Sequence, residues 1–587
     1  KTKSTFHILK GISGFAKPGE VLGIMGASGS GKSTLLDFLF GRLSSGVASG
    51  EILVNGAPQN HDSFKHFAAY VPQEDHLMGT MTVHETLMFA AEMTLPASKS
   101  REYKEEKVTT VLEELGLVSC QDTKIGTVFQ KGISGGQKRR VSLAVEMISN
   151  PRILMLDEPT SGLDSLAAFQ LVSNLKTLAR GGRSIIATIH QPSSETFHML
   201  DRLLLLHKGE VVYFDKVDKV VSYFANLGHQ CPTYTNPADY VLQLINTDFG
   251  MKVDVPKLIT AYKESNQETV AYIKDCQQRH AKEESDIDEN HTFQSTVVKQ
   301  FGQLAIRFWK DNVRNPGVFW VRMFMYTMLS IMIGTIYLNI GNGQNEVQDR
   351  GGILFYIAAF MVFMAVSVIP AFIQDKAVYN RETMNGWYSP GPYVVASTLS
   401  SIPGLLLLSI TSTVIIYPLV GLQSGADRFF IFLADLFLSL WCSEALMMLI
   451  SVLVPFYIIG MALGAGVYGM FMLTEGFLVL KSNLPVYWIW SYYIGFHTYS
   501  FRVFMFNEFD GLDIECDQSV CAYKSGEDVL DVYDMEDVNI GADLLVLFCI
   551  GLFFRIMCYV MLKILHKRSL PINKDANMLT SAGETAQ

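Results

Sequence analysis

The second half of this 587-residue chain contains six apolar stretches, each long enough to cross a lipid bilayer. A helix needs about 20 apolar residues to span the hydrocarbon core, and backbone groups in lipid must bond within helices or closed barrels. We expect spans at about 317–339, 351–374, 393–421, 429–454, 457–480 and 542–564. Residues 298–587 are therefore predicted to form an all-α transmembrane domain with six helices.

The first half has a different pattern. Residues 1–245 alternate short apolar runs with stretches of helical periodicity, which is typical of parallel βα units. A soluble α/β domain is therefore expected before the membrane domain. Residues 246–297 are polar and include the acidic run KEESDIDEN at 282–290, so we interpret them as a linker or mobile loop.

Composition narrows the classes of function. Apolar residues make up 49% of the chain and charged residues only 18%, against roughly 25% charged in a typical globular protein. These values indicate a membrane component. The formal net charge of −10 argues against nucleic acid as a partner, because nucleic-acid binders usually present a basic surface.

A short amphipathic segment precedes the first predicted span. Phe301, Leu304 and Phe308 fall on one helical face, with Arg307 and Lys310 opposite. This pattern favours a helix lying flat on the membrane surface, although an ordinary packed helix would show the same pattern.

Basic residues near the ends of the spans predict the orientation. They gather between spans two and three and after span six, which by the positive-inside rule places both termini in the cytoplasm and residues 481–541 outside. Cys516 and Cys521 lie in that outer segment, where an oxidising exterior favours a disulfide. Two free thiols, or a bridge to a partner chain, are the alternatives.

Residues 26–33 read GASGSGKS and stand between an apolar strand and an apolar helix. This is the P-loop pattern in its required strand–loop–helix setting. Glycines let backbone amides turn towards phosphate oxygens, and the helix N-terminus adds its dipole. Lys32 would place a cation on the β- and γ-phosphates, while Ser33 would offer its hydroxyl to Mg²⁺. We therefore predict that the α/β domain is a P-loop ATPase.

Four apolar residues and two acids form the sequence ILMLDE at 153–158. This indicates a buried strand that delivers carboxylates to the carboxyl edge of the sheet, where α/β sites form. Asp157 would hold Mg²⁺, and Glu158 would accept a proton from the attacking water. A strand that merely ends in exposed acids is the alternative.

Further motifs lie around these two. SGGQ follows at 134–137, LDEPTSGLD at 156–164, His190 stands in TIHQPS, and Gln73 stands in YVPQED. With the P-loop, this set closely resembles the ATP-binding cassette (ABC) ATPases. A cassette followed by six spans, with NPADY at 236–240, resembles the G subfamily of ABC half-transporters.

The resemblance implies a role for each motif. Glu158 and His190 would be catalytic, with His190 touching the γ-phosphate and helping to orient the water. Gln73, which would read the nucleotide, is also implied as a metal ligand beside Ser33 and Asp157. The ATP-binding residues implied are Gly26, Ala27, Ser28, Gly29, Ser30, Gly31, Lys32, Ser33, Thr34, Gln73, Ser134, Gly135, Gly136, Gln137 and Asp164. The family often stacks adenine on an aromatic residue at the position near Lys3, where this sequence has no obvious aromatic; Phe6 is the nearest, so base recognition is unassigned.

The resemblance also implies a dimer. The SGGQ of one subunit would contact ATP bound at the P-loop of the other, and Asp164 would communicate across the pair. The implied function is ATP-driven export of lipid-like or amphipathic hydrophobic substrates, with the plasma membrane as the expected location. Loading of a small-molecule precursor into an internal compartment, or an ATP-gated regulatory role, are alternatives. The sequence does not identify the substrate. It also does not distinguish a homodimer from a heterodimer.

By resemblance, spans two and five line a central cavity, with Phe363, Phe477 and Leu478 as its residues. The stretch 375–393 would carry the motion of the cassette as a short cytoplasmic helix, with Arg381 and Glu382 as candidate contacts.

Costly charges stand within the spans, and we expect them to pair with one another or to face a cavity. They are Arg322, Asp435, Glu444, Glu475 and Arg555. Gly460 and Gly464 form a GxxxG match, which suits either packing within the chain or a dimer seam.

Overall fold

The chain forms two compact units in a computed structural model. The structure describes residues 7–566 apart from 44–45, 48, 60–63, 66, 128–129, 247–252, 281–294 and 516–521. We call the first the cassette unit, which contains the described residues up to Thr296 together with Asn380–Tyr388. The second, which we call the membrane unit, contains Val297–Tyr379 and Ser389–Leu565.

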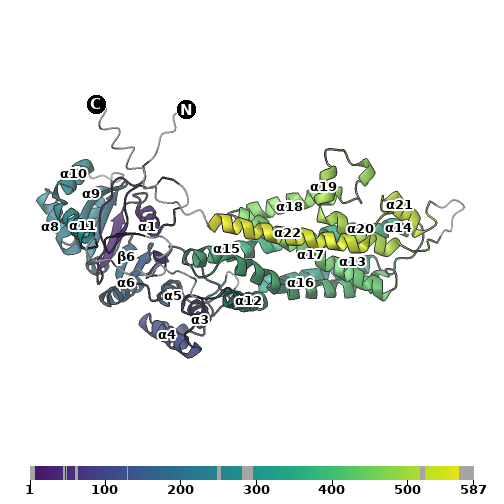
Figure 1. The fold of residues 1–587 in the computed structure, drawn as a ribbon, viewed down its shortest axis with the longest axis horizontal. Coiled ribbons are helices and arrows are strands. Elements are labelled where there is room, and N and C mark those ends of the chain that lie inside the picture. Colours follow the sequence, from purple (N-terminus) through teal and green to yellow (C-terminus); the bar gives the residue numbers. More distant parts are fainter. Residues whose placement is uncertain are drawn as a thin grey trace. The chain divides into compact units, whose positions relative to one another are not determined.

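A six-stranded sheet forms the centre of the cassette unit, in the order β4-β5-β6-β1-β7-β8. Its strands are parallel except β8, which runs antiparallel to β7. They are β1 (Val21–Gly26), β4 (Ala68–Val71), β5 (Ile153–Leu156), β6 (Ser184–Thr188), β7 (Arg202–His207) and β8 (Glu210–Lys216). Helices flank this sheet (Figure 1), which confirms the predicted α/β class. A small hairpin of β2 (Leu53–Val54) and β3 (Ala57–Pro58) stands apart.

The helices of the cassette unit pack their apolar faces against the sheet or against one another. They are α1 (Lys32–Phe40), α3 (Val83–Thr94), α4 (Arg101–Glu114), α5 (Gly135–Met147), α6 (Ser165–Arg180), α7 (Ser194–His198), α8 (Val220–Asn226), α9 (Pro237–Ile245), α10 (Val255–Ser265) and α11 (Gln267–His280).

Two of these helices lie where we predicted a linker. α10 buries Leu258, Ile259 and Tyr262, and Tyr262 joins the core on one side of the sheet. α11 places Tyr272 against Phe15, with 4.2 Å between the ring centroids. In this polar stretch only a few apolar residues, at helical spacing, pack against the rest of the unit. Because the stretch is polar on average, its composition did not indicate these two helices. The acidic run at 282–290 lies outside the described residues.

The membrane unit is helical, as predicted, and its long helices α16, α17 and α22 run side by side (Figure 1). Its helices are α12 (Val297–Arg314), α13 (Val321–Ile336), α14 (Glu346–Tyr356), α15 (Ile369–Met384), α16 (Pro390–Val420), α17 (Ala426–Leu453), α18 (Tyr457–Thr474), α19 (Ile489–Ile494), α20 (Phe496–Phe509), α21 (Gly526–Val532) and α22 (Ile540–His566). Short π and 3₁₀ turns connect α14 to α15, which gives one apolar helix over Glu346–Met384.

Among the described residues, five helices are long and apolar enough to cross a membrane. The first predicted span corresponds to α13, which has 16 residues and follows a π turn at Pro316–Trp320. The fifth predicted span is shorter than expected. α18 ends at Thr474, and Gly476 adopts a left-handed φ of 113° that ends the apolar run as a helix.

The predicted outer segment is more ordered than a loop. α20 buries Phe496, Phe501, Phe504 and Phe509 in the core of the membrane unit. The acidic residues from Glu508 to Asp537 obscure these aromatic positions in the sequence. Cys516 and Cys521 lie outside the described residues, so the disulfide stays a prediction.

α12 packs along α16 within the membrane unit. Leu304 and Phe308 are buried as expected, and the amide of Asn312 donates to the carbonyl of Ser400 at 2.9 Å. Arg307 is also buried, contrary to its predicted place on the polar face, while Trp309 is about half exposed. This face of α12 therefore packs within the protein, and the place of the helix at the membrane surface stays a prediction.

The GxxxG match serves packing within the chain. A Cβ at Gly460 would lie 2.9 Å from Ile369 Cγ2, and one at Gly464 would lie 3.0 Å from Met447 Sδ. Both positions admit close approach of neighbouring helices because they lack a side chain.

Candidate ATP site

The P-loop connects β1 to α1 at the centre of the sheet. Gly29 and Gly31 adopt left-handed φ angles of 75° and 99°, and Gly31 is the N-cap of α1. Only glycine adopts these angles without strain, so the loop can turn its amides inward at the helix N-terminus. The loop therefore has the backbone conformation that the predicted phosphate cradle requires, and phosphate binding by its residues stays a prediction.

Lys32 is the first residue of α1 and lies almost fully buried beneath the loop. Its ammonium donates to the carbonyls of Gly26 at 2.9 Å and Ala27 at 3.1 Å. Burial lowers the pKa of Lys32, and the carboxylates of Glu158 and Asp157 oppose that shift. The cation is thus held at the loop beside two acids.

Asp157 follows β5 and lies at the carboxyl edge of the sheet. The hydroxyl of Ser33 donates to Asp157 Oδ1 at 3.0 Å, and the hydroxyl of Thr188 donates to the same oxygen at 2.7 Å. Hydroxyl and carboxylate oxygens are the ligands that Mg²⁺ prefers. Ser33 and Asp157 would hold Mg²⁺ with the nucleotide phosphates, where the ion would neutralise charge on the transferred group.

Glu158 lies beside Asp157 with an unusual backbone. Its φ is 43°, a left-handed value that costs a non-glycine residue roughly 1–3 kcal/mol and marks functional positions. Its amide donates to Thr188 Oγ1 at 2.7 Å, and its Oε2 accepts from Gln73 Nε2 at 2.7 Å. The structure therefore joins Gln73 directly to the predicted catalytic carboxylate.

Arg139 is a site residue that the sequence reasoning missed. Its guanidinium donates to the carbonyls of Pro72 at 2.6 Å, Asp157 at 2.7 Å and Pro159 at 3.2 Å. It also pairs with the carboxylate of Asp75 at 2.9 Å. One buried side chain thus connects the segment that carries Gln73 to the segment that carries Glu158. The only sequence signal is an arginine two residues after SGGQ.

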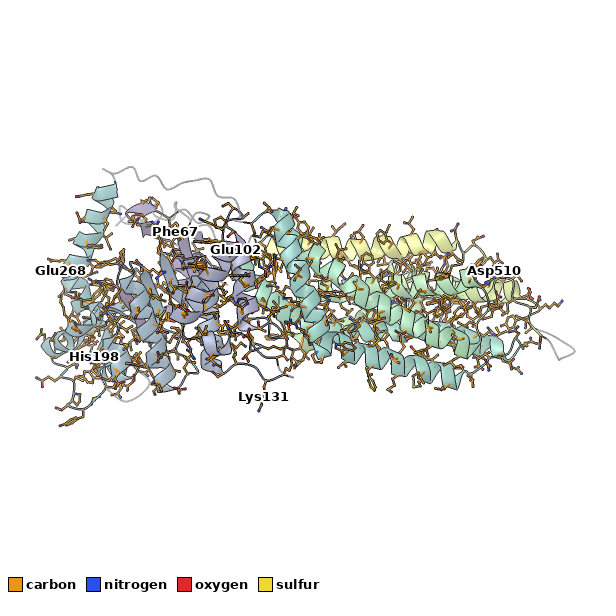
Figure 2. All side chains as sticks on the ribbon, turned by 90° about the horizontal axis from the view of Figure 1, so that it is seen from below. Phe67, Glu102, Lys131, His198, Glu268 and Asp510 are labelled. Carbon is orange, nitrogen blue, oxygen red and sulfur yellow. The ribbon has the colours of Figure 1, made fainter. Side chains whose placement is uncertain are left out.

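The SGGQ motif forms the N-terminus of α5. The hydroxyl of Ser134 accepts from the Gln137 amide at 3.2 Å, and Gln137 Oε1 accepts from the Ser134 amide at 2.9 Å. This capping box leaves Ser134 and Gly135 exposed at the end of the helix, and Lys131 projects from the preceding loop (Figure 2). Among the described residues, no hydrogen bond joins the motif to the P-loop.

His190 and Asp164 also lie at exposed ends of elements. His190 stands two residues after β6, and the following Gln191 has a left-handed φ of 46°. Asp164 is the N-cap of α6, where its carboxylate accepts from the Ala167 amide at 2.9 Å. Both side chains remain available to a ligand or a partner.

The predicted coupling stretch contributes residues 380–388 to the cassette unit. Arg381 Nη2 lies 3.0 Å from Glu146 Oε1, and both side chains are 3% exposed. Arg381 also donates to the carbonyl of His76 at 2.9 Å, three residues after Gln73. Glu382 instead accepts from the hydroxyl of Tyr388 at 2.6 Å. Of the two candidate contacts, Arg381 therefore reaches the segment that carries the site.

The three predicted cavity residues lie in different surroundings. Phe363 contacts the rings of Phe360 and Tyr468. Phe477 packs among the rings of Phe355, Phe501 and Tyr533, whereas the side chain of Leu478 is 55% exposed. Their role towards a substrate stays a prediction.

A P-loop, two strand-end acids and an exposed capped signature helix, in a chain with a helical membrane unit, define an ATP-hydrolysing transporter. Family models agree. The ABC transporter family matches residues 9–161, and two ABC-2 type transporter families match residues 299–509 and 190–252.

Individual relatives match over nearly the whole chain. ABC transporter G family member 1 of Petunia hybrida is 38% identical over 95% of this chain and 88% of its own length. G family member 11 of Arabidopsis thaliana is 37% identical over 95% and 83%, and member 22 of Dictyostelium discoideum is 33% identical over 96% and 92%. The chain therefore belongs to the G family of ABC transporters. It is an integral membrane protein that binds and hydrolyses ATP to drive transport.

Proposed function

We propose that two half-transporters form the working unit, with each ATP bound between the P-loop of one subunit and the SGGQ of the other. The observation that carries this proposal is the exposed signature helix. Ser134 and Gly135 are exposed, and nothing lies within 4 Å of a Cβ at Gly135. A helix N-terminus with free amides attracts an anion, and a second subunit would supply it as the γ-phosphate of its bound ATP.

The side chains of the site suggest how hydrolysis proceeds. Glu158 would accept the proton of the attacking water, since Gln73 and Arg139 hold its segment in place. His190 would orient the same water. Lys32 and the inward-turned amides would stabilise charge on the phosphates, while Ser33 and Asp157 would hold Mg²⁺ with Gln73 nearby.

A mixed dimer tests the shared site. Lys32→Met disables the P-loop, and Ser134→Asp places a negative charge at the signature while preserving a helix cap, because aspartate is a good N-cap residue. Neither homodimer should hydrolyse ATP. A dimer purified through two different tags, with one variant per subunit, holds one site with both changes and one intact site.

If the sites are shared, the mixed dimer recovers a substantial part of wild-type activity. If each subunit completes its own site, the mixed dimer is as inactive as its parents, and the proposal fails. Ser134→Asn is the matched comparison, since it caps the helix without the charge and should therefore lose less activity than Ser134→Asp.

We further propose that the transporter exports lipid-like or amphipathic hydrophobic molecules across the plasma membrane, with both termini in the cytoplasm. Apolar aromatic residues such as Phe363 and Phe477 in the membrane unit support this class of substrate. In lipid nanodiscs, lipids and flat amphipathic compounds should stimulate ATPase activity of the wild type and not of Glu158→Gln. Stimulation by polar solutes alone would contradict it.

A further inference from the structure

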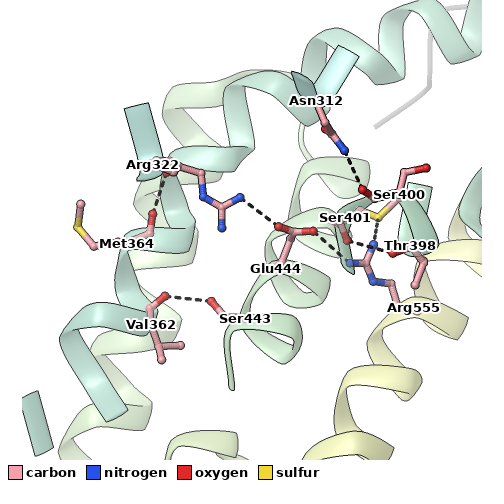
Figure 3. A network of polar contacts seen from close by, with 12 residues as sticks. Asn312, Arg322, Val362, Met364, Thr398, Ser400, Ser401, Ser443, Glu444 and Arg555 are labelled. Carbon is pink, nitrogen blue, oxygen red and sulfur yellow. Dashed lines mark hydrogen bonds and ion pairs between the residues drawn. The ribbon is translucent and has the colours of Figure 1, made fainter. Parts of the chain in front are cut away.

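Three charged side chains from three helices meet inside the membrane unit (Figure 3). Arg322 of α13 places Nη1 3.2 Å from Glu444 Oε2, and Arg555 of α22 places Nη2 3.4 Å from Glu444 Oε1. Glu444 stands on α17 between them. The side chains are only 4–9% exposed. The predicted pairing is therefore confirmed for these three charges, whereas Asp435 accepts from the hydroxyl of Ser500 and Glu475 has no ion pair among the described residues.

The charges in this cluster do not balance. Guanidinium groups stay protonated in proteins, so two cations share one carboxylate. Within the described part of the chain, no second carboxylate lies within 4 Å of either guanidinium. An uncompensated cation is costly at membrane depth, where such residues normally pair or face a cavity. The cluster therefore carries one positive charge that no carboxylate among the described residues compensates.

Several donors of the cluster are also unused. Arg322 Nε and Nη2 and Arg555 Nε are buried without a hydrogen-bond partner among the described residues. Arg555 Nη1 lies 2.9 Å from the sulfur of Met448, which is a weak acceptor. Buried donors are almost always satisfied in native proteins, so these N–H groups point to a missing acceptor.

We propose that Arg322 and Arg555, which Glu444 holds together, bind the anionic head group of an amphiphile, a phosphate or a carboxylate. The planar guanidinium fork matches the oxygens of both groups and binds them strongly in a low-dielectric setting. One such anion neutralises the cluster and accepts the free N–H donors. This inference does not depend on the proposed transport function. It states only that the anionic amphiphile binds at this site, whether or not the protein transports it.

The surface near Arg322 favours an amphiphile over a free ion. Val321, Phe324 and Met328 on α13 are 54%, 67% and 48% exposed, and they flank Arg322 in sequence. An acyl chain could cover these apolar side chains while its head group reaches the guanidinium. A free phosphate would gain nothing from them.

The test uses the full-length protein in dodecyl maltoside and follows thermal unfolding. Dodecyl phosphate and laurate supply the two anionic head groups on one chain length. Dodecyl phosphocholine supplies the same chain without net charge, and inorganic phosphate supplies the anion without a chain. We expect the first two to raise the melting temperature in a saturable way and the last two to leave it unchanged.

Each other pattern overturns the inference. Equal stabilisation by dodecyl phosphocholine would show that the chain alone binds, and stabilisation by inorganic phosphate would show a free-ion site. No stabilisation by either anionic amphiphile would show that the unused donors have no such ligand. Native mass spectrometry should show one tightly held anionic adduct per chain, and its absence would contradict the proposal.

Variants separate a binding role from a structural one. Arg322→Gln and Arg555→Gln each leave a neutral pair, so affinity for dodecyl phosphate should fall at least about tenfold. Glu444→Gln increases the surplus charge, so binding should be retained or tightened. Arg502→Gln is the matched control, because it removes a membrane-unit arginine that already has its own carboxylate, Asp543, at 3.1 Å.

Stability of the variants does not decide the matter alone. If the arginine variants do not fold, Glu444→Gln carries the test, and weaker binding by folded Glu444→Gln would overturn the inference. Arginine variants that melt earlier but keep wild-type affinity would assign the cluster a purely structural role.

Discussion

The two units solve the problem of buried charge in different ways. In the cassette unit, Glu146 and Arg381 form a balanced pair, and each carboxylate of the ATP site has at least one neutral donor. In the membrane unit, two arginines share Glu444 and leave donors unused. Balanced polar groups can hold a fixed geometry without a ligand, whereas unbalanced ones require something from outside the chain.

The largest expected effect concerns the balanced ATP site. Glu158→Gln preserves the shape of the side chain and can still contact Gln73, but it removes the proton acceptor. ATPase turnover should fall by about 10²–10⁴-fold, the typical contribution of a general base, while ATP binding is unchanged. Turnover measured beside nucleotide binding checks both. Undiminished hydrolysis would remove Glu158 from the role of base.

Arg381→Met would create in the cassette unit the imbalance that the membrane unit already has. It leaves Glu146 buried without its cation, and breaking such a pair typically costs about 3–5 kcal/mol. A lower melting temperature of the purified protein checks this. The double variant Arg381→Met/Glu146→Leu should recover much of the loss, because both charges are gone. No recovery would mean that the pair has another role.

The pH dependence of that variant sharpens the comparison. Burial raises the pKa of Glu146, and the charge of Arg381 opposes that rise. Without Arg381 the pKa should rise further, so the folded state binds a proton that the unfolded state has released. Stability of Arg381→Met should therefore increase as the pH falls from the raised pKa towards about 4.3, the ordinary value for glutamate. Melting curves between pH 8 and pH 5 would show it, and a flat difference from wild type would refute it.

The smallest expected effect compares two glycines of α18. Gly460→Ala forces a methyl group against Ile369 and should destabilise the protein by about 1–3 kcal/mol. Nothing lies within 4 Å of a Cβ at Gly466, so Gly466→Ala should stabilise the helix by roughly 0.5–1 kcal/mol. Melting temperatures of the two variants check this. A destabilising Gly466→Ala would indicate that another subunit contacts that face.

The sequence predicts those parts of the site that follow local rules. The P-loop, Asp157 and Glu158 depend on a strand, a turn and a helix that are close in the chain, so their patterns reveal them. Arg139 donates hydrogen bonds to carbonyls that lie up to 67 residues away in the sequence. A local sequence pattern cannot predict contacts over that separation. Some predicted boundaries of the spans differ from the observed helix ends for a similar reason. One left-handed glycine, Gly476, ends the helix although four apolar residues follow it, and α20 is recognisable only by the aromatic residues that it buries.

The position of residues 380–388 matters for the design of fragments and domain exchanges of this protein. They comprise the last residues of α15 and part of the turn to α16, and Trp387 and Tyr388 are buried, with Trp387 against Phe89 of the cassette unit. A soluble fragment that stops at Thr296 would lack residues 380–388. The buried carboxylate of Glu146 would then have lost its partner Arg381. Chimaeras that exchange membrane domains between relatives would carry a foreign piece into the nucleotide-binding half, so the natural exchange boundaries lie on either side of this nine-residue insert.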